Sequence, residues 1–226
     1  MIVIRPMRVV SGPIGRERVH FEAPPAGRVD SEMGTFLDWF NNSHTDWVTK
    51  AGVAHLWFVT IHPFDDGNGR LARAISDMAL TRAEDTPQRF YSMSSQIRAE
   101  RKDYYRALED TQRGSLDITM WLEWFMGCAR RAVIGAENTL SSVLAKARFW
   151  RNIQSVPVND RQRKILNLLL GDFKGNLTTA KWAMIAKCSH DTALRDITGL
   201  IDDGVLKHGP AGGRSTTYHL ETDKLL

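Results

Sequence analysis

Hydrophobic and polar positions divide the chain into a long, mostly helical part and a shorter part with a different order of elements. Residues 5–23 alternate short β-prone runs around a turn rich in Gly and Pro, which predicts a β-hairpin. From Ser31 onward apolar residues recur at helical spacing, and this predicts helices that include residues 33–40 and 53–57. Another amphipathic helix is predicted from Leu71, where apolar residues follow an i, i+3, i+4, i+7, i+8 pattern.

Helical spacing continues through the next segments. Ser94 or Ser95 is expected to cap a helix that continues through Leu108, and residues 116–150 can form one or two long helices. Residues 1–150 are therefore predicted to form one mainly α domain with a small β-hairpin at its start.

The remaining residues follow a different order. After an expected linker at 151–159, residues 160–226 predict three helices, the third ended by Gly204, and then two short strands around a Gly-rich turn. Three helices followed by a two-stranded wing is the order of a winged helix-turn-helix domain. The chain as a whole is predicted to be mainly α.

Composition supports a folded protein. The 226 residues are 42% hydrophobic and 25% charged, which is enough to bury a sizeable core. The two cysteines, Cys128 and Cys188, have no metal-site or disulfide-framework spacing, and no apolar run reaches the roughly 18 residues of a membrane helix. We therefore expect a cytoplasmic protein without a signal peptide or membrane segment. The net charge of +4 is spread along the chain and does not by itself indicate nucleic-acid binding.

The loop before the third helix carries the candidate chemistry. Gly67 and Gly69 flank Asn68 just before a helix, so amide N–H groups can converge where the helix dipole is positive and favours an anion. Arg70 and Arg73 lie in the first turn of that helix, and guanidinium groups suit phosphate oxygens. This combination predicts a site for several phosphates.

Three other residues of the loop extend the prediction. Asp66 offers a hard oxygen ligand for a Mg²⁺ ion shared with a polyphosphate, and His62 can accept a proton from a hydroxyl group near neutral pH. Phe64 is expected to anchor the loop to the core. Each of these elements is more often structural when it occurs alone, so the prediction of nucleotidyl or phosphoryl transfer depends on their combination.

The order of these residues is specific. "HPFDDGNGRLAR", residues 62–73, resembles the signature of the Fic (filamentation induced by cAMP) family: HPF, any residue, Asp or Glu, GNGR, two residues, Arg. "RVHFEAPP" resembles the family's flap, which docks target chains, and "RKDYYRALEDTQRG" also fits the family. The resemblance covers about residues 5–145, and a C-terminal winged helix accompanies many Fic enzymes.

The resemblance implies transfer of AMP from ATP to a Tyr, Thr or Ser hydroxyl of a target protein, with release of pyrophosphate. His62 would be the general base and Asp66 would hold Mg²⁺ on the α- and β-phosphates. The amides of Gly67 and Gly69 would cradle phosphate. The resemblance assigns further nucleotide contacts to Asn68 at the cradle, to Arg70 and Arg73 at the γ end, and to Tyr104 and Tyr105, which core positions would explain equally well.

The flap has its own physical basis. An edge strand at Val19, His20 and Phe21 could pair with an extended target segment through main-chain hydrogen bonds, although an ordinary edge strand would show the same pattern. The inhibitory pattern of many Fic proteins, Ser or Thr followed after three residues by Glu and then Gly or Asn, is missing. We therefore expect that a regulatory segment has been removed or that inhibition comes from another chain. A homodimer is left open.

Two other functions are compatible with the sequence. One is a Fic-like enzyme that transfers a different phosphate-containing group. The other is a nucleotide-sensing DNA-binding regulator. Its candidate DNA contacts are Ser189, His190, Thr192 and Arg195 of the expected recognition helix, with His208 and Arg214 beside the wing. Residues 158–226 hold ten Lys and Arg against eight Asp and Glu, and this balance favours a protein-interaction module over DNA binding.

Overall fold

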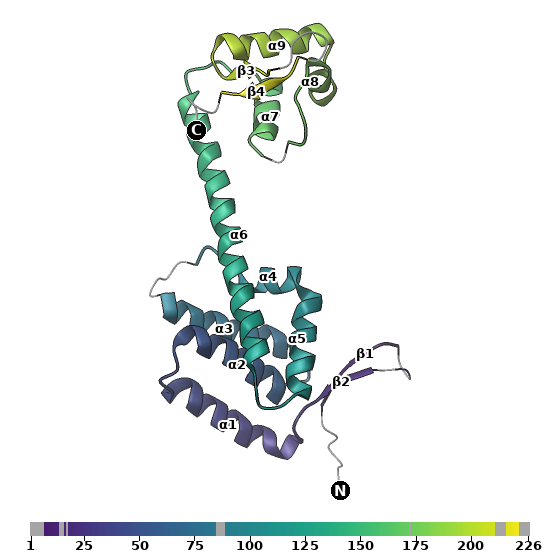
Figure 1. Cartoon of the computed structure of the whole chain (residues 1–226), viewed down its shortest axis with the longest axis vertical. Helices are drawn as coiled ribbons and strands as arrows, with labels where there is room; N and C mark the ends of the chain where they lie inside the picture. Colours follow the sequence, from purple (N-terminus) through teal and green to yellow (C-terminus); the bar gives the residue numbers. More distant parts are fainter. Residues whose placement is uncertain are drawn as a thin grey trace. The chain divides into compact units, whose positions relative to one another are not determined.

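The computed structural model describes residues 7–13, 16, 18–84, 89–171, 173–210 and 216–221 (Figure 1). The chain divides into two compact units, Met1–Ala136 and Glu137–Leu226. Both units are mainly helical and each contains a small antiparallel sheet, which confirms the predicted fold class at this level.

The hairpin predicted near the start is present. Strand β1 (Arg8–Ser11) pairs antiparallel with β2 (Arg18–Glu22). Val9 lies opposite Phe21, whereas Val10 lies opposite Val19, so the register shifts by one residue between Val9 and Val10. This irregularity is a β-bulge in which the extra residue belongs to β2.

Three helices follow the hairpin: α1 (Ala26–Asn42), α2 (Trp47–Ile61) and α3 (Asn68–Glu84). Helix α1 begins before the predicted Ser31, because Pro25 has a φ of −54° that suits the start of a helix. Its first turn is mostly exposed and therefore has no apolar stripe to mark it. Asp46 caps α2 by accepting from the Thr49 amide at 2.9 Å.

Helix α2 is the centre of the first unit. It is hydrophobic on all sides, and most of its residues are buried, as expected of a helix that neighbours surround. Helix α6 (Thr119–Asn152) approaches it closely at Gly52, where an added Cβ would lie 2.9 Å from Leu122 Cδ2. Trp121 Nε1 donates to the Gly52 carbonyl at 2.8 Å at this crossing.

Helices α4 (Met93–Ala99) and α5 (Arg101–Arg113) correct one prediction. The expected single helix capped by Ser94 or Ser95 is wrong: Ser92 is the cap, and the helix is interrupted at Glu100. Arg131 on α6 donates through Nε and Nη2 to the two oxygens of the Glu100 carboxylate, and these bonds lower the pKa of Glu100. The break therefore lies at a residue held by a distant partner, with no Gly or Pro to indicate it.

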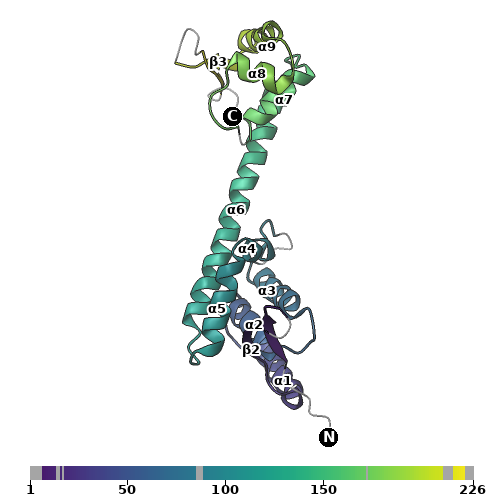
Figure 2. The ribbon, with the colours of Figure 1, turned by 90° about the vertical axis from the view of Figure 1, so that its right-hand side faces the viewer.

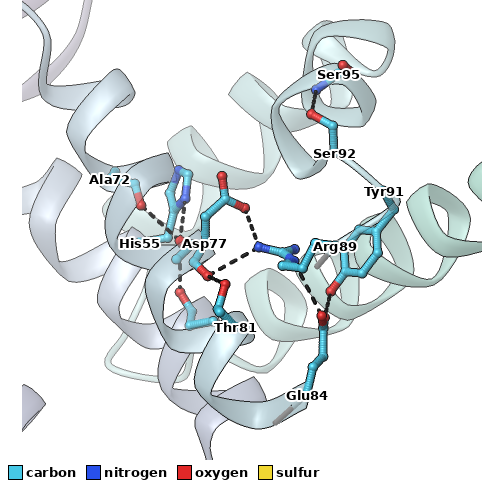
Figure 3. Close-up of polar contacts among 11 residues, drawn as sticks. His55, Ala72, Asp77, Thr81, Glu84, Arg89, Tyr91, Ser92 and Ser95 are labelled. Carbon is cyan, nitrogen blue, oxygen red and sulfur yellow. Dashed lines mark hydrogen bonds and ion pairs between the residues drawn. The ribbon is translucent and has the colours of Figure 1, made fainter. Parts of the chain in front are cut away.

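A polar cluster joins the end of α3 to the segment before α4 (Figure 3). Arg89 Nη1 donates to the Asp77 carboxylate at 2.9 Å and to the Asp77 carbonyl at 3.2 Å. The Tyr91 hydroxyl donates to Glu84, and the Arg89 guanidinium lies 4.3 Å from the centroid of the Tyr91 ring. Burial raises the pKa of Tyr91 to about 12. These contacts hold residues 89–92 against α3.

The second unit contains the end of α6, helices α7 (Asp160–Leu169), α8 (Thr179–Ala186) and α9 (His190–Asp202), and strands β3 (Leu206–His208) and β4 (Tyr218–Leu220). Figure 2 shows α7, α8 and α9 grouped together, with β3 beside them. Their shared core includes Phe149, Ile165, Trp182, Ile197 and Leu200. The expected turn around Arg214 lies outside the described residues.

The ends of these helices follow local sequence signals. Asn159 and Gln162 form a reciprocal capping box at the start of α7. Gly204, with a φ of +70°, follows the end of α9 as predicted. Within the described parts of the chain, none of the helices combines the length and apolar character needed to cross a bilayer.

Lys50 is a buried cation in the first unit. Its ammonium donates to the carbonyls of Phe40 at 3.0 Å and Ser43 at 2.9 Å, at the C-terminal end of α1. The same nitrogen lies 4.3 Å from the centroid of a Trp47 ring. A cation at this end of a helix satisfies carbonyls that have no intrahelical partner and complements the helix dipole.

We expect Lys50→Met to lower the free energy of unfolding of the first unit by about 1–3 kcal/mol, because buried carbonyls would lose their donor. Urea unfolding followed by tryptophan fluorescence measures the change. Lys146→Met is the matched control, since Lys146 is exposed on α6. Equal unfolding midpoints for the two variants would contradict the assigned role of Lys50.

Candidate functional site

His62 lies at the junction between α2 and the loop. It has a left-handed backbone, with φ 52° and ψ 56°, which is uncommon for a residue other than glycine. Its Nδ1 lies 3.3 Å from the Val59 carbonyl, which can only accept, so this contact favours a proton on Nδ1. Nε2 then carries the lone pair and is the basic nitrogen of the ring.

Asn68 closes the loop. Its Oδ1 accepts from the Phe64 amide at 3.1 Å, and its Nδ2 donates to the Phe64 carbonyl at 2.6 Å. Asn68 is only 3% exposed, so water competes little with these bonds. Gly67 has a φ of +91°, and its carbonyl accepts from the amides of Arg70 and Leu71 to begin α3. The loop is therefore a closed turn that leads directly into the start of α3.

The two arginines of the loop have different surroundings. Arg70 Nη2 pairs with Asp66 Oδ2 at 2.8 Å, and the Asp66 side chain is 90% exposed. None of the described carboxylates lies within ion-pair distance of Arg73. Of these two arginines, only Arg73 lines the cavity described below.

A cavity of about 870 Å³ opens beside His62. The loop and the start of α3 form one wall, the hairpin forms another, and α5 forms the third. The cavity brings together many of the residues predicted from the sequence: His20, Phe21, His62, Asn68, Gly69, Arg73, Tyr104 and Tyr105. It does not include four others: Val19, Asp66, Gly67 and Arg70.

The two tyrosines differ in burial. Tyr104 is 5% exposed and packs against the rings of Trp121 and Trp124, whereas Tyr105 is 51% exposed. Burial raises the pKa of Tyr104. Tyr104 is therefore a core residue that also reaches the cavity, and Tyr105 is a surface residue beside it.

Phe64 is a weaker anchor than expected. Its ring centroid lies 6.4 Å from that of Phe58, but half of the residue, 50%, remains exposed. The hydrogen bonds between Asn68 and the Phe64 backbone fix this position instead.

The residues that hold the hairpin were not predicted from the sequence. Glu109 Oε1 accepts from Arg18 Nη2 at 2.8 Å and from Arg113 Nη1 at 2.7 Å, and Glu109 Oε2 lies 2.9 Å from His20 Nδ1. Arg113 Nη2 also donates to the Val19 carbonyl at 3.0 Å. The hydrogen bond with His20, together with the arginines, lowers the pKa of Glu109. The i,i+4 spacing of Glu109 and Arg113 was the only local signal, and it does not reveal contacts with a distant strand.

Few of the described side chains near the loop could bind a metal ion. Within the part of the chain that the structure describes, no group of three or more His, Cys, Asp or Glu side chains could hold a metal ion. Asp66 is a single exposed carboxylate. Such a residue suits only an ion whose other ligands come from water and a bound ligand.

We expect Asn68→Ala to destabilise the first unit by about 1–3 kcal/mol, since the Phe64 amide and carbonyl would both lose their partner. Thermal unfolding measures this loss. Asn42→Ala is the control, because Asn42 is exposed at the end of α1 and bonds only Asp38 in the same helix. An Asn68 variant as stable as the control would show that its two bonds do not hold the loop.

We also expect Glu109→Gln to loosen the hairpin, because the neutral amide loses the charge that attracts Arg18 and Arg113. Hydrogen exchange at residues 18–22 should become faster by about three- to tenfold, which corresponds to about one ordinary hydrogen bond. Glu123→Gln, on an exposed position of α6, is the control. Unchanged exchange at these amides would contradict the role of Glu109.

Comparison with known proteins adds an independent observation. Residues 5–80, which include the hairpin and the loop, match the model of the Fic/DOC family. The chain is 32% identical over 116 residues to the protein adenylyltransferase Fic of Nematostella vectensis. The aligned segment covers 49% of this chain and 25% of that protein. It is 30% identical over 99 residues to a probable protein adenylyltransferase of Aquifex aeolicus, covering 43% of this chain and 28% of that protein.

Among solved structures, a Fic family protein from Desulfovibrio desulfuricans G20 aligns with 24% identity and a TM-score of 0.47, over 96% of this chain and 62% of that chain. The matched segments span about a quarter of the length of the Nematostella and Aquifex proteins. The family model and the named relatives together support a relation between this part of the chain and the Fic/DOC family.

Proposed function

We propose that the protein is a Fic-type protein adenylyltransferase, which transfers AMP from ATP to a Tyr, Thr or Ser hydroxyl of a target protein and releases pyrophosphate. The observation that carries this proposal is the cavity that joins the imidazole of His62 to the N-terminal turn of α3 and to the guanidinium of Arg73. A base and a phosphate site thus share one space. The match to the Fic/DOC family and the relatives named protein adenylyltransferases support the same activity.

His62 is the proposed general base. With Nδ1 directed at the Val59 carbonyl, its Nε2 can accept the proton of a target hydroxyl. The hydroxyl oxygen then forms a bond to the α-phosphorus of ATP, the bond from that phosphorus to the pyrophosphate oxygen breaks, and the proton remains on His62. Positioning and charge stabilisation contribute most of the rate, with the base adding about 10²- to 10⁴-fold.

The start of α3 is the proposed phosphate site. Amide N–H groups in the first turn of a helix lack intrahelical acceptors and lie at the positive end of the dipole, which favours a phosphate near Gly67, Asn68 and Gly69. Arg73 adds a charge that no described carboxylate neutralises. Arg70 would join it after release from Asp66, the residue with which it pairs.

Asp66 fits a Mg²⁺ ion that a polyphosphate shares. The carboxylate is exposed, and its Oδ1 has no hydrogen bond among the described contacts. Mg²⁺ is commonly held by one or two carboxylates together with water and phosphate oxygens. When bound, the ion would reduce the negative charge on the phosphates.

The hairpin is the proposed docking site for the target. An extended segment could pair with β2 along Val19, His20 and Phe21, and it would then lie beside the cavity that contains His62. The Val19 carbonyl already accepts a hydrogen bond from Arg113 of α5. When a target strand binds, Arg113 would either share this carbonyl with the target or give up its bond to it.

We propose that residues 160–226 form a winged helix-turn-helix domain, with 1–150 as the catalytic domain and 151–159 as a linker. Helices α7 to α9 followed by β3 and β4 have the order of that domain. Asp196 does not face outward, because it is buried in bonds with Arg161 and Asn159. The exposed residues of α9 still mix both charges, which favours protein contacts over DNA.

A different transferred group remains the alternative within the same site. Asn68, Gly69 and Arg73 line the cavity, and these residues suit a phosphate whichever group is attached to it. Incorporation of label from α-labelled ATP, but not from γ-labelled ATP, would support AMP transfer. The opposite result would favour phosphoryl transfer.

We expect His62→Ala to reduce AMP transfer to proteins of a cell lysate by at least about 100-fold, because the target hydroxyl would lose its base. ATP affinity should change less than about twofold, since the imidazole acts on the target rather than on the phosphates. Transfer is measured with α-labelled ATP and affinity by calorimetry. His44→Ala is the control, as His44 is exposed in the loop between α1 and α2. Full transfer by His62→Ala would exclude this residue as the base.

A further inference from the structure

His55 is a buried polar residue beside the cavity, and it has no part in the proposed reaction. It lies in the middle of α2 and has no exposed surface. Its Nδ1 is 3.1 Å from Ser76 Oγ on α3, and its Nε2 is 3.0 Å from the Tyr104 hydroxyl on α5. One imidazole therefore connects three helices.

The direction of these hydrogen bonds follows from the number of protons. Ser76 Oγ lies 2.9 Å from the Ala72 carbonyl and 3.1 Å from the Ala51 carbonyl, and both carbonyls can only accept. The single proton of Ser76 is thus committed to the backbone, so Ser76 must accept from His55 Nδ1. Neutral imidazole has one N–H group, and His55 Nε2 must then accept from the Tyr104 hydroxyl.

This order determines what Tyr104 can offer to the cavity. Its proton is directed inward to His55, and its oxygen keeps acceptor capacity while carrying no charge. Contacts with Trp121 and Trp124 hold the ring in place. Tyr104 is therefore a fixed, neutral hydrogen-bond acceptor in the wall of the cavity.

Arg73 supplies a cation to this cavity. It lines the same cavity as Tyr104, and its Nη1 lies 3.6 Å from the position that a Cβ on Gly69 would occupy. Burial, followed by the positive charge of Arg73, lowers the pKa of His55 to about 3, and the charge of Arg73 also acts on Tyr104. Arg73 and Tyr104 thus line one cavity, and the guanidinium lies beside Gly69 at the start of α3.

We propose that His55 and Ser76 are positioning residues that fix the Tyr104 oxygen as a neutral acceptor for Arg73, and so orient this guanidinium toward the polyphosphate of ATP. The inference rests on the proposed function, because it assigns Arg73 to a phosphate. A carboxylate could hold Arg73 equally well, but it would neutralise part of the charge that the phosphates require. A tyrosine whose proton is occupied holds the cation and leaves its full charge available.

The test measures binding of ATP and of AMP by calorimetry. Tyr104→Phe keeps the ring and removes the oxygen, and His55→Phe keeps an aromatic ring and removes both hydrogen bonds. We expect each variant to weaken ATP binding by about five- to tenfold, within the range of one ordinary hydrogen bond. AMP binding should change less than about twofold, because AMP lacks the distal phosphates.

Coupling to Arg73 is the decisive part. In an Arg73→Ala background, Tyr104→Phe should cause no further loss of ATP affinity, since the oxygen would have no guanidinium to orient. Lys50→Met is the control for general destabilisation, because Lys50 is buried in the same unit but does not line the cavity. This control should bind ATP as the unmodified protein does.

The outcomes separate the two levels of the proposal. If the unmodified protein does not bind ATP, the proposed function and this inference are both overturned. If the unmodified protein binds ATP, three results would overturn only the inference. They are an unchanged ATP affinity in Tyr104→Phe, equal losses of affinity for ATP and for AMP, and a loss in Tyr104→Phe that adds fully to the loss in Arg73→Ala. Nitrogen NMR of the His55 ring gives a readout without nucleotide: we expect a proton on Nδ1, and a proton on Nε2 would contradict the proposed order.

Discussion

The cavity depends on how the end of α2 is joined to the start of α3. Asn68 bonds both backbone groups of Phe64 and thereby closes a turn of only a few residues between two packed helices. His62 lies at one end of this turn and the amides of α3 lie at the other. Because α2 is buried on all sides, neither end can move without disturbing the core. The proposed base and the proposed anion site are thus held at a fixed separation by the packing of the core.

Charged groups in the first unit are held in two different ways. Glu100 and Glu109 are each bonded by arginine, and these ion pairs connect α5 to its neighbours. Lys50 is held only by carbonyls and aromatic rings. Carbonyl oxygens hold a cation without neutralising its charge. We infer the same arrangement for Arg73, with the neutral phenol oxygen of Tyr104 as the acceptor. Glu100, Glu109 and Lys50 thus hold elements together, whereas we infer that the charge of Arg73 remains available to a ligand.

Local sequence signals predicted much of the first unit and of the site. The hairpin, the helices on both sides of the loop, and the residues from His62 to Arg73 all have signatures within a few positions of one another. The break at Glu100 has its partner in Arg131, and the hairpin is held from Glu109, so both depend on contacts between residues far apart in sequence. Periodicity carries no information about such contacts. His55 was missed for a similar reason, because a histidine in an apolar helix resembles any other buried residue.

The β-bulge in the hairpin has a consequence for the proposed docking of a target strand. A strand with regular alternation can slip along its partner, and a slip of one residue turns every side chain to the other face. The shift between Val9 and Val10 makes β2 irregular, and an irregular edge tolerates fewer alignments. A target strand paired there would be selected by how many residues separate its paired amides from its hydroxyl. The hairpin would then fix the number of residues between the paired segment of the target and its reactive hydroxyl.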